Sequence, residues 1–305
     1  MMQDILKIAT VPNEGLTIGI AMTASTCREA ARLHELKATS SIALGRLISC
    51  TALVGLMQEK PGALSMQIVS NGRLKQVYAD VTAVGDLRGY VQTPDLDLPL
   101  FSNEAPTGRR AIAAGFGVGH LSVIRNADIH DFVQSTTELI HKEVDTDVLH
   151  YLEQSDQNLT ALQADTLLNE HGNVDLAGAI FVQALPNPNL QLLESLRKQL
   201  EDGLFVKLLQ KHGRAGELNA ILESFCPTAQ WTPKVHPLRW KCRCSYERVL
   251  VALKMMSATD LAEMVDERKE ASVNCHFCNK NFTVSPEDLE KVLTDLIIDK
   301  GTARN

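Results

Sequence analysis

The feature that most constrains this 305-residue chain is a group of cysteines near its C-terminus. Of seven cysteines, four fall within 37 residues and form two close pairs. These four are Cys242, Cys244, Cys275 and Cys278. Four thiolates in two close pairs make the ligand set of a tetrahedral zinc site, with Zn–S bonds of about 2.3 Å. The sequence therefore predicts one zinc ion per chain, held by these four cysteines.

The two pairs differ in spacing. The second pair, Cys275-His276-Phe277-Cys278, has the C-x-x-C spacing usual in zinc knuckles. The first pair is C-x-C, but in an extended segment residues two apart project to the same face, about 6.6 Å apart at Cα. Both of its sulfurs can therefore reach one metal. A thioredoxin-like dithiol would need a βαβ context that Ser272–Asn279 does not offer, and a zinc deaminase would need an H-x-E element that is absent.

Two functions remain open for such a site, a structural zinc ribbon and a redox switch. Zinc binds thiolates only, so oxidised sulfurs cannot hold it. Sulfurs around tetrahedral zinc lie about 3.8 Å apart, whereas a disulfide needs about 2.05 Å. A unit of roughly 70 residues has a marginal core without a staple, so loss of the metal could unfold it. Disulfides between the pairs would keep a long loop closed, worth roughly 3–4 kcal/mol, whereas disulfides within each pair would leave the chain free.

The rest of the chain predicts a mixed α/β protein. Two β-rich runs, Leu64–Val69 and Leu74–Ala79, bracket the tight-turn signal Asn71-Gly72, which favours a largely antiparallel sheet. Pro186-Asn187-Pro188 then breaks the chain, and the spacing of apolar residues becomes helical. We expect three parts: an α/β core domain, 1–185; an amphipathic helical linker, 186–226; and a C-terminal zinc-binding domain, 227–305.

The linker carries a leucine stripe, a row of apolar side chains at helical spacing. It consists of Leu190, Leu193, Leu196, Leu200, Leu204 and Leu208. Such a stripe usually docks a helix on a neighbouring core. The alternative is a segment whose apolar face can be released, which needs a trigger from elsewhere in the chain.

Charge and hydropathy argue against other classes of protein. The formal charge of −7 makes the chain a poor binder of phosphate backbones. The N-terminus lacks the features of a signal peptide. No apolar run approaches the roughly 18–20 residues of a membrane helix, and the most apolar stretch, Leu47–Met57, is interrupted by Ser49 and Thr51. We therefore expect a cytoplasmic protein that binds neither membranes nor nucleic acid.

Motifs along nearly the whole chain resemble those of the redox-regulated 33-kDa heat-shock chaperones, a family of ATP-independent holdases. The spacing of the four cysteines is similar to that of the family. Further similar segments are Ser40–Arg46, Gly85–Val91, Tyr151–Gln157, Leu176–Ala179 and Gln183–Pro186. The family often has a glycine-containing turn before its C-x-x-C, and Glu267–Val273 contains no glycine.

The resemblance implies an α/β (α+β) fold, with an N-terminal, mostly antiparallel sheet domain, a helical linker and a small C-terminal zinc-binding domain. It also implies a non-enzymatic chaperone that is inactive when reduced and zinc-bound. Oxidation would release zinc, unfold the C-terminal region and expose apolar surface that holds unfolding client proteins, with a tendency to form homodimers. The leucine stripe is the candidate client-binding surface.

We predict that oxidation pairs Cys242 with Cys244 and Cys275 with Cys278, because sequence neighbours have the highest effective concentration once the metal leaves. The three other cysteines have no role in the family, and free cysteine commonly behaves as a small buried hydrophobic residue. These three are Cys27, Cys50 and Cys226.

The alternative function is a constitutive interaction or nucleic-acid-binding module built on a structural zinc ribbon. Its support is local, because two aromatic residues lie among basic ones, a mixture that single-strand binding uses. The residues are Trp240, Lys241, Arg243, Tyr246 and Arg248. The last part of the chain is nearly neutral as a whole, which argues against this alternative.

Overall fold

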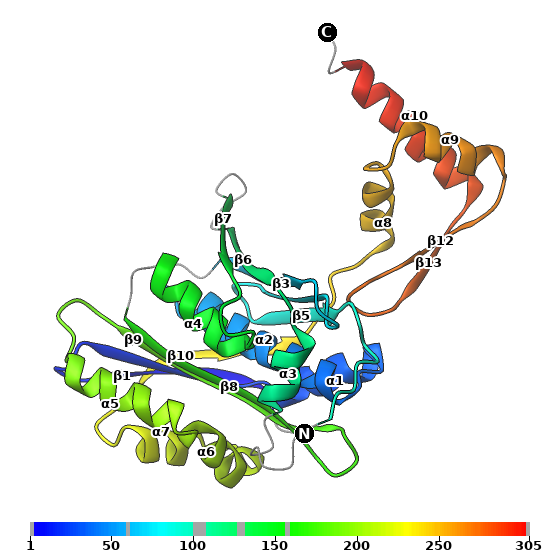
Figure 1. Ribbon diagram of the computed structural model, residues 1–305. Coiled ribbons are helices and arrows are strands. Elements are labelled where there is room, and N and C mark those ends of the chain that lie inside the picture. The colour runs from blue at the N-terminus through cyan, green and yellow to red at the C-terminus, as the bar shows by residue number, and fades with distance from the viewer. Residues whose placement is uncertain (1–2, 59–61, 100–107, 127–131, 156–158, 303–305) are drawn as a thin grey trace. The chain divides into compact units, whose positions relative to one another are not determined.

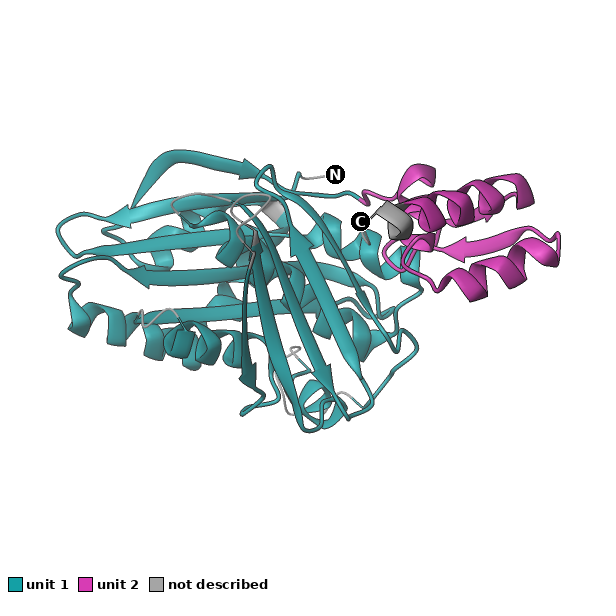
Figure 2. Cartoon of the chain, turned by 90° about the horizontal axis from the view of Figure 1, so that it is seen from above, with its two compact units in different colours: residues 1–241 teal, residues 242–305 magenta. Residues whose placement is uncertain are grey.

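The protein is described by a computed structural model covering residues 3–58, 62–99, 108–126, 132–155 and 159–302. The chain divides into two compact units, Met1–Lys241 and Cys242–Asn305 (Figure 2). The first unit contains two β-sheets and several helices, and the second contains a β-hairpin and helices. The predicted mixed α/β fold with mostly antiparallel sheets is confirmed.

The first sheet has the strand order β10-β1-β2-β9-β8, and all its neighbouring strands are antiparallel. The strands are β1 (Ile5–Val11), β2 (Leu16–Met22), β8 (Thr160–Leu168), β9 (Val174–Ala184) and β10 (Gln230–Pro237). Strands β2, β8 and β9 are buried along almost their whole length. Such continuous burial means that both faces of this sheet are covered.

The second sheet has the order β11-β5-β4-β3-β6-β7, and only the short β11–β5 pair is parallel among its described strands. Its strands are β3 (Ala63–Ser70), β4 (Gln76–Val81), β5 (Asp86–Val91), β6 (Gly119–Asn126), β7 (Phe132–Glu138) and β11 (Arg239–Trp240). The predicted turn at Asn71-Gly72 does connect two antiparallel strands, although the second begins at Gln76, two residues later than expected.

Helix α2 (Ala38–Leu56) contacts strands of both sheets and forms the centre of the first unit (Figure 1). Gly45 and Gly55 permit this close packing, because a Cβ at either position would meet Thr166 or Val81 within 2.4 Å. The sequence-based prediction that no apolar run approaches membrane-spanning length was wrong. An 18-residue window of α2 has a mean hydropathy of 1.4, and all of it is buried inside the protein.

The remaining helices of the first unit fall into two groups (Figure 1). The first group packs with α2 and consists of α1 (Ala24–His34), α3 (Arg109–Gly115) and α4 (Val144–Ser155). The second group covers the other face of the first sheet and consists of α5 (Leu190–Glu201), α6 (Leu204–His212) and α7 (Leu218–Phe225). The first sheet therefore separates two apolar cores.

The second unit is built on a small apolar core that includes Leu261, Phe282, Val284 and Leu289. Its elements are α8 (Tyr246–Leu253), α9 (Ala258–Asp266), β12 (Ala271–Asn274), β13 (Asn281–Val284) and α10 (Pro286–Thr302). The segment Glu267–Val273, which leads into the β12–β13 turn, contains no glycine. Arg268 takes the left-handed conformation there, with φ of +51°. A core of this size is marginal without a further covalent or metal link.

Residues 227–241, which we expected in the C-terminal domain, form β10 and β11 in the two sheets of the first unit. The helices of the expected linker also belong to the first unit. The division into an α/β core domain, 1–185, a helical linker, 186–226, and a zinc-binding domain, 227–305, stays a prediction, while the two compact units meet between Lys241 and Cys242. Two residues of the motif Tyr151–Gln157, Asp156 and Gln157, lie outside the described residues.

A buried group of ion pairs crosses the main core. Arg46 of α2 is fully buried and donates to Glu143 at 2.7 Å and Asp165 at 2.9 Å. Beside them, Arg109 makes two hydrogen bonds to Asp145, at 2.9 and 2.8 Å. Buried charges are tolerated only when paired in this way. The lone arginine in the apolar stretch 42–56 is the sequence signal for this group, which was not among the predicted features.

Within this group, Glu143 should make the free energy of unfolding depend on pH. Burial raises the pKa of Glu143 to about 8, against the attraction of Arg46. The unfolded chain loses this proton near its ordinary pKa of 4.5. Folded protein therefore holds an extra proton between these values, and the free energy of unfolding falls as the pH rises through this range.

We expect Glu143→Gln, which has no proton to lose, to remove that decrease. Between about pH 5 and pH 8.5, wild type should lose about 4 kcal/mol more of its free energy of unfolding than the variant. Urea unfolding followed by Trp231 and Trp240, both in the first unit, measures the difference. The exposed Glu194→Gln serves as the control and should follow wild type. Parallel pH curves for wild type and Glu143→Gln would contradict the assignment.

Candidate metal centre

The first cysteine pair lies in the irregular segment between β11 and α8. Arg248 of α8 reaches back and donates to the carbonyl oxygen of Arg243 at 2.8 Å. Ser245 accepts from the Arg248 amide at 3.3 Å and so caps the first turn of α8. The sulfurs of Cys242 and Cys244 lie within 4.8 Å of one another, so both can reach one metal, as expected from the C-x-C spacing.

The second pair lies in the turn of the β12–β13 hairpin. The Cys275 amide donates to the Lys280 carbonyl at 3.0 Å, and the amides of Cys278 and Asn279 donate back to the Cys275 carbonyl. Asn279 closes the turn in the left-handed conformation, with φ of +55°. These bonds hold the C-x-x-C segment in one compact turn.

The four sulfurs converge. The Sγ atoms of Cys242 and Cys275 are 3.6 Å apart, and those of Cys244 and Cys278 are 3.5 Å apart. All four sulfurs lie within 4.8 Å of one another and are half-buried. Sulfurs bound to one tetrahedral zinc would be about 3.8 Å apart. The donor set and its spacing therefore fit a single metal ion.

Without a metal, the thiols share protons unequally. Burial opposes ionisation of Cys242, but hydrogen bonds from the Cys244 amide and the neighbouring thiols outweigh it and lower its pKa. The pKa values of Cys244 and Cys278 are raised, chiefly by burial. The Cys242 sulfur thus carries negative charge more readily than those of Cys244 and Cys278.

The chain that leads into the first pair is fastened to the second sheet through the start of the segment Gly85–Val91. Gly85 takes a φ of +82°, and a Cβ there would collide with the carbonyl oxygen of Pro237. Asp86 accepts from Arg239 at 2.6 Å and pairs with Lys241 at 3.2 Å. Burial alone would raise the pKa of Asp86, but these two cations hold it below its usual value. This fastening was not predicted from the sequence.

The leucine stripe lies in the first unit, against the first sheet. Four of its members are buried in the second core of that unit: Leu193, Leu196, Leu200 and Leu208. Leu204 is half-buried in the same core, whereas Leu190 is 55% exposed. Most of the proposed client-binding surface is therefore covered in this state.

The three spare cysteines are buried and take no part in the four-sulfur group. Burial raises the pKa of Cys27 to about 12, and it raises the pKa of Cys50 well above the ordinary value. Cys226 is 3% exposed, at the end of α7. These positions match the prediction of small buried side chains.

Two compact units, one of them small and organised around four converging thiols, define an α+β protein with a candidate metal centre. The Hsp33 protein family matches residues 4–285, and the chain belongs to this family.

Similar proteins and a similar structure cover nearly the whole chain. A 33 kDa chaperonin of Synechococcus elongatus is 33% identical over 97% of this chain and 99% of its own. One from a Cyanothece species is 31% identical over 98% of this chain and 100% of its own. The crystal structure of the 33 kDa chaperonin of Thermotoga maritima matches with a TM-score of 0.80 at 24% identity, covering 97% of this chain and 99% of that one.

The burial of the spare cysteines predicts two classes of thiol reactivity. In the reduced, metal-free chain at about pH 8, iodoacetamide should modify Cys242, whose pKa is lowered, at least about 100-fold faster than Cys27 and Cys50, whose pKa values are raised, because only the thiolate reacts. Peptide mass spectrometry over a time course measures each rate. In urea all seven cysteines should react alike, which is the control. Rapid native modification of Cys27 or Cys50 would contradict the burial seen here.

Proposed function

We propose that this chain is a cytoplasmic molecular chaperone that holds unfolding proteins without ATP and is activated by oxidation of its four clustered cysteines. Two findings support the chaperone function: membership of the Hsp33 family, and similar proteins that carry the name 33 kDa chaperonin. The observation that carries the redox part is the convergence of four thiols in a unit with a small core.

In the reduced form, Cys242, Cys244, Cys275 and Cys278 would hold one zinc ion. When bound, zinc would supply four Zn–S bonds, and structural zinc sites of this kind contribute on the order of 10–16 kcal/mol to folding. The thiols meet from two directions, since one pair precedes α8 and the other lies in the β12–β13 turn. Holding all four together therefore ties the segment before α8 to the β12–β13 turn.

Oxidation changes what these sulfurs can do. Two thiols and one molecule of hydrogen peroxide give one disulfide and two molecules of water, so two peroxides convert the whole cluster. A sulfur in a disulfide is no longer a thiolate ligand. The second unit then depends on its apolar core and on the disulfides, whose positions decide whether it stays folded.

We propose pairing within each close pair, Cys242–Cys244 and Cys275–Cys278. The shortest sulfur separations in the folded unit run between the pairs, at 3.6 and 3.5 Å, so pairing across them is the competing outcome. As the unit opens, disulfides between sequence neighbours should form faster than disulfides across the pairs, because the effective concentration of neighbours does not depend on the fold. Cys275–Cys278 should form first, since an extended C-x-C spans about 6.6 Å at Cα, near the upper limit for a disulfide.

Release of the leucine stripe would follow along the chain. The stripe is docked on the first sheet, and the residues between α7 and Cys242 form β10 and β11 of the first unit. Strand β10 is an edge strand, joined to the sheet through β1 alone. We propose that unfolding of the second unit frees β11 and β10, then loosens α5–α7 and bares their apolar face to clients.

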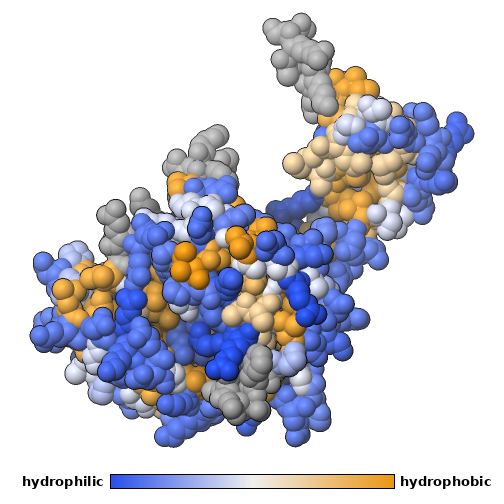
Figure 3. Space-filling model, in the orientation of Figure 1, coloured by the Kyte–Doolittle hydropathy of each residue, from blue (hydrophilic) through white to orange (hydrophobic). Residues whose placement is uncertain are grey.

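The surface of the thiol form is consistent with an inactive state. On the face of the first unit shown in Figure 3, apolar areas are small and separated by hydrophilic residues. The leucines of α5 and α6 would form a larger apolar surface than these areas, but they are buried in this form. Association of oxidised chains into homodimers would be a consequence of baring such a surface.

A nucleic-acid-binding module receives less support. Trp240 is packed against the core of the first unit, with its ring edge-on to His34 at 6.3 Å. Lys241 pairs with Asp86. The aromatic and basic side chains that favoured single-strand binding in the sequence are thus partly engaged within the protein.

The test is aggregation of a heat-unfolded client, followed by light scattering, with zinc measured in parallel. The reduced chain should carry one zinc and leave aggregation unchanged. Peroxide treatment should release the zinc and suppress aggregation at near-equimolar chaperone. Cys242→Ser or Cys275→Ser should weaken zinc binding severely, whereas Cys226→Ala, a matched buried thiol, should behave as wild type. Equal protection by the reduced and oxidised chains would contradict redox control, and no protection by either would contradict the chaperone function.

A further inference from the structure

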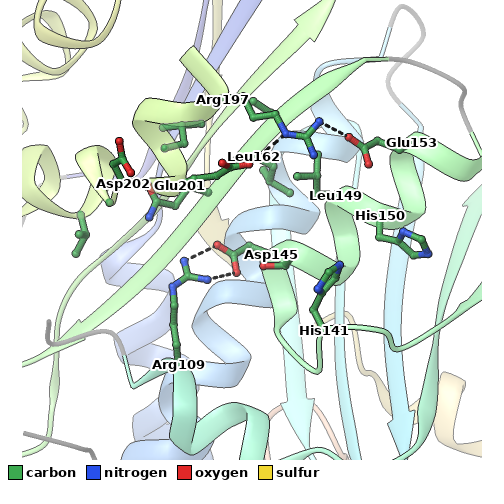
Figure 4. Close-up of a pocket in the computed structure, with 16 residues that line it drawn as sticks. Arg109, His141, Asp145, Leu149, His150, Glu153, Leu162, Arg197, Glu201 and Asp202 are labelled. Atoms are coloured by element: carbon green, nitrogen blue, oxygen red, sulfur yellow. Dashed lines mark hydrogen bonds and ion pairs between the residues drawn. The ribbon is translucent and has the colours of Figure 1, made fainter. Parts of the chain in front are cut away.

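A groove of about 620 Å³ lies along the free edge of β8, outside the candidate metal centre. This volume falls within the roughly 300–1,000 Å³ of typical ligand pockets. Helix α4 and β8 form one wall, and α5 with the turn into α6 forms the other. An ion pair of 2.7 Å between Arg197 of α5 and Glu153 of α4 joins the walls (Figure 4). The groove therefore exists only while α5 is docked on the first sheet.

The lining of the groove carries surplus negative charge. It holds four carboxylates and two guanidiniums, which gives a net charge of −2 when its two histidines are neutral. Arg109 and Asp145 compensate each other through two hydrogen bonds. Arg197 is shared by Glu153 and Glu201, at 2.7 and 3.3 Å, so one negative charge remains beside this guanidinium.

The second surplus charge belongs to Asp202, which makes no ion pair among the described residues. Asp202 is the residue that caps the C-terminal end of α5. A helix carries partial negative charge at this end, so a cation is favoured there and a carboxylate is not. The groove thus places two uncompensated negative charges where the protein itself supplies no further cation.

Unused hydrogen-bond acceptors lie beside these charges. Gln163 lines the groove and is 6% exposed, and its buried Oε1 has no hydrogen-bond partner among the described residues. The Ala164 amide points away from the sheet, since it donates to Asp145 at 3.0 Å. Leu162, two residues earlier on the same edge, therefore presents its carbonyl oxygen outward as well. Buried polar atoms are normally hydrogen-bonded, so these acceptors indicate a place for a donor.

Apolar side chains make up much of the remaining lining and restrict the kind of cation that fits. They are Leu149, Ala161, Leu162, Leu200 and Val206. In Figure 4, Asp202 and Glu153 lie on opposite sides of Leu162. Within the part of the chain that the structure describes, no three carboxylates or histidines of this groove come close enough to hold a metal ion. The lining therefore fits two cationic groups joined by an aliphatic chain better than a compact metal ion.

We propose that this groove binds a linear aliphatic diamine or polyamine, which holds α5 in its docked position and so opposes activation. One ammonium group donates to Asp202 and Gln163, and the other lies beside Glu153 and Glu201. The aliphatic chain between them covers the apolar lining.

The regulatory part of this inference rests on the proposed function, whereas the binding part does not. A ligand that needs both walls binds the docked state and not the released one. Its binding lowers the equilibrium constant for release by a factor of 1 + [ligand]/Kd, which is about tenfold at ten times Kd. The ligand would thus raise the degree of oxidation that is needed to bare the leucine stripe.

Binding is tested by isothermal titration of the reduced, zinc-loaded full-length chain at low ionic strength. The probes are unbranched α,ω-diamines with chains of about four to eight carbons, and one length should bind best, at one site per chain. A monoamine of that length should bind at least about fivefold more weakly, because it lacks the second ion pair. Mg²⁺, which has the same charge, should bind at least about tenfold more weakly, because it makes no apolar contacts.

Three protein variants locate the site. Gln163→Leu removes the unpartnered acceptor at similar volume and should weaken binding of the best diamine about tenfold, the effect of one hydrogen bond to a charged group. Asp202→Asn, at an exposed position, should weaken it about threefold without affecting the fold. Glu194→Gln removes the same charge from the exposed side of α5 outside the groove and should change binding less than about 1.5-fold.

The regulatory part is tested by oxidising the zinc-loaded chain with peroxide in the presence of the best diamine at ten times its Kd. Client protection should appear about tenfold more slowly than without the diamine. Asp202→Asn should be slowed less at the same diamine concentration, and Glu194→Gln should be slowed as much as wild type. Diamine added after oxidation is complete should leave protection unchanged, which excludes an effect on the client itself.

Failure of this proposal is distinguishable from failure of the proposed function. No saturable binding, equal binding of Mg²⁺ and the diamines, or equal effects of Asp202→Asn and Glu194→Gln would each overturn the diamine site. Unchanged activation with the diamine bound would overturn its regulatory role. Oxidation-dependent protection of clients would leave the redox chaperone standing in all these cases. Diamine binding without client protection in either redox form would retain the site and overturn the chaperone function.

Discussion

The apolar face of α5 and α6 can be buried only once, either against the first sheet or against another polypeptide. In the structure it packs on the sheet and forms the second core of the first unit together with β1, β2, β8 and β9. Burial of such side chains is non-directional and depends on area removed from water, so an unfolding protein offers a comparable environment. Everything proposed about function depends on this competition between an internal and an external partner.

The chain that joins the four cysteines to α7 links them to that competition. This connection consists of β10, which pairs with β1, and β11, which is fastened by Asp86 to the second sheet. The Gly85-Asp86 part of the family motif thus has a physical role: its glycine permits close approach of Pro237, and its carboxylate pairs with two cations that precede the cysteines in the sequence. A signal that begins with sulfur oxidation must undo these contacts before the helices can loosen.

The four cysteines of the candidate site could be predicted from the sequence because their spacing along the chain is short and typical of metal ligands. C-x-C and C-x-x-C specify four thiols, and the leucine periodicity specifies an amphipathic face. By contrast, pairing of β10 with β1 joins residues more than 200 positions apart, and β10 contains two prolines, which only an edge strand tolerates. Sequence alone therefore could not show that 227–241 pairs with strands of the first unit. Similarly, Arg46 indicates that a buried partner exists, but only the fold shows that Glu143 and Asp165 supply it.

The central claim, that oxidation of the cysteines releases the leucine stripe from the first sheet, is tested most directly by hydrogen exchange with mass spectrometry on both redox forms. We expect oxidation to remove protection from the second unit, from β10 and from α5–α7, while β3, β4 and α2 keep theirs. Disulfide mapping on the same sample should find pairs within each close pair. Disulfides across the pairs, with unchanged exchange in 190–240, would contradict the claim and leave a structural metal site as the better description.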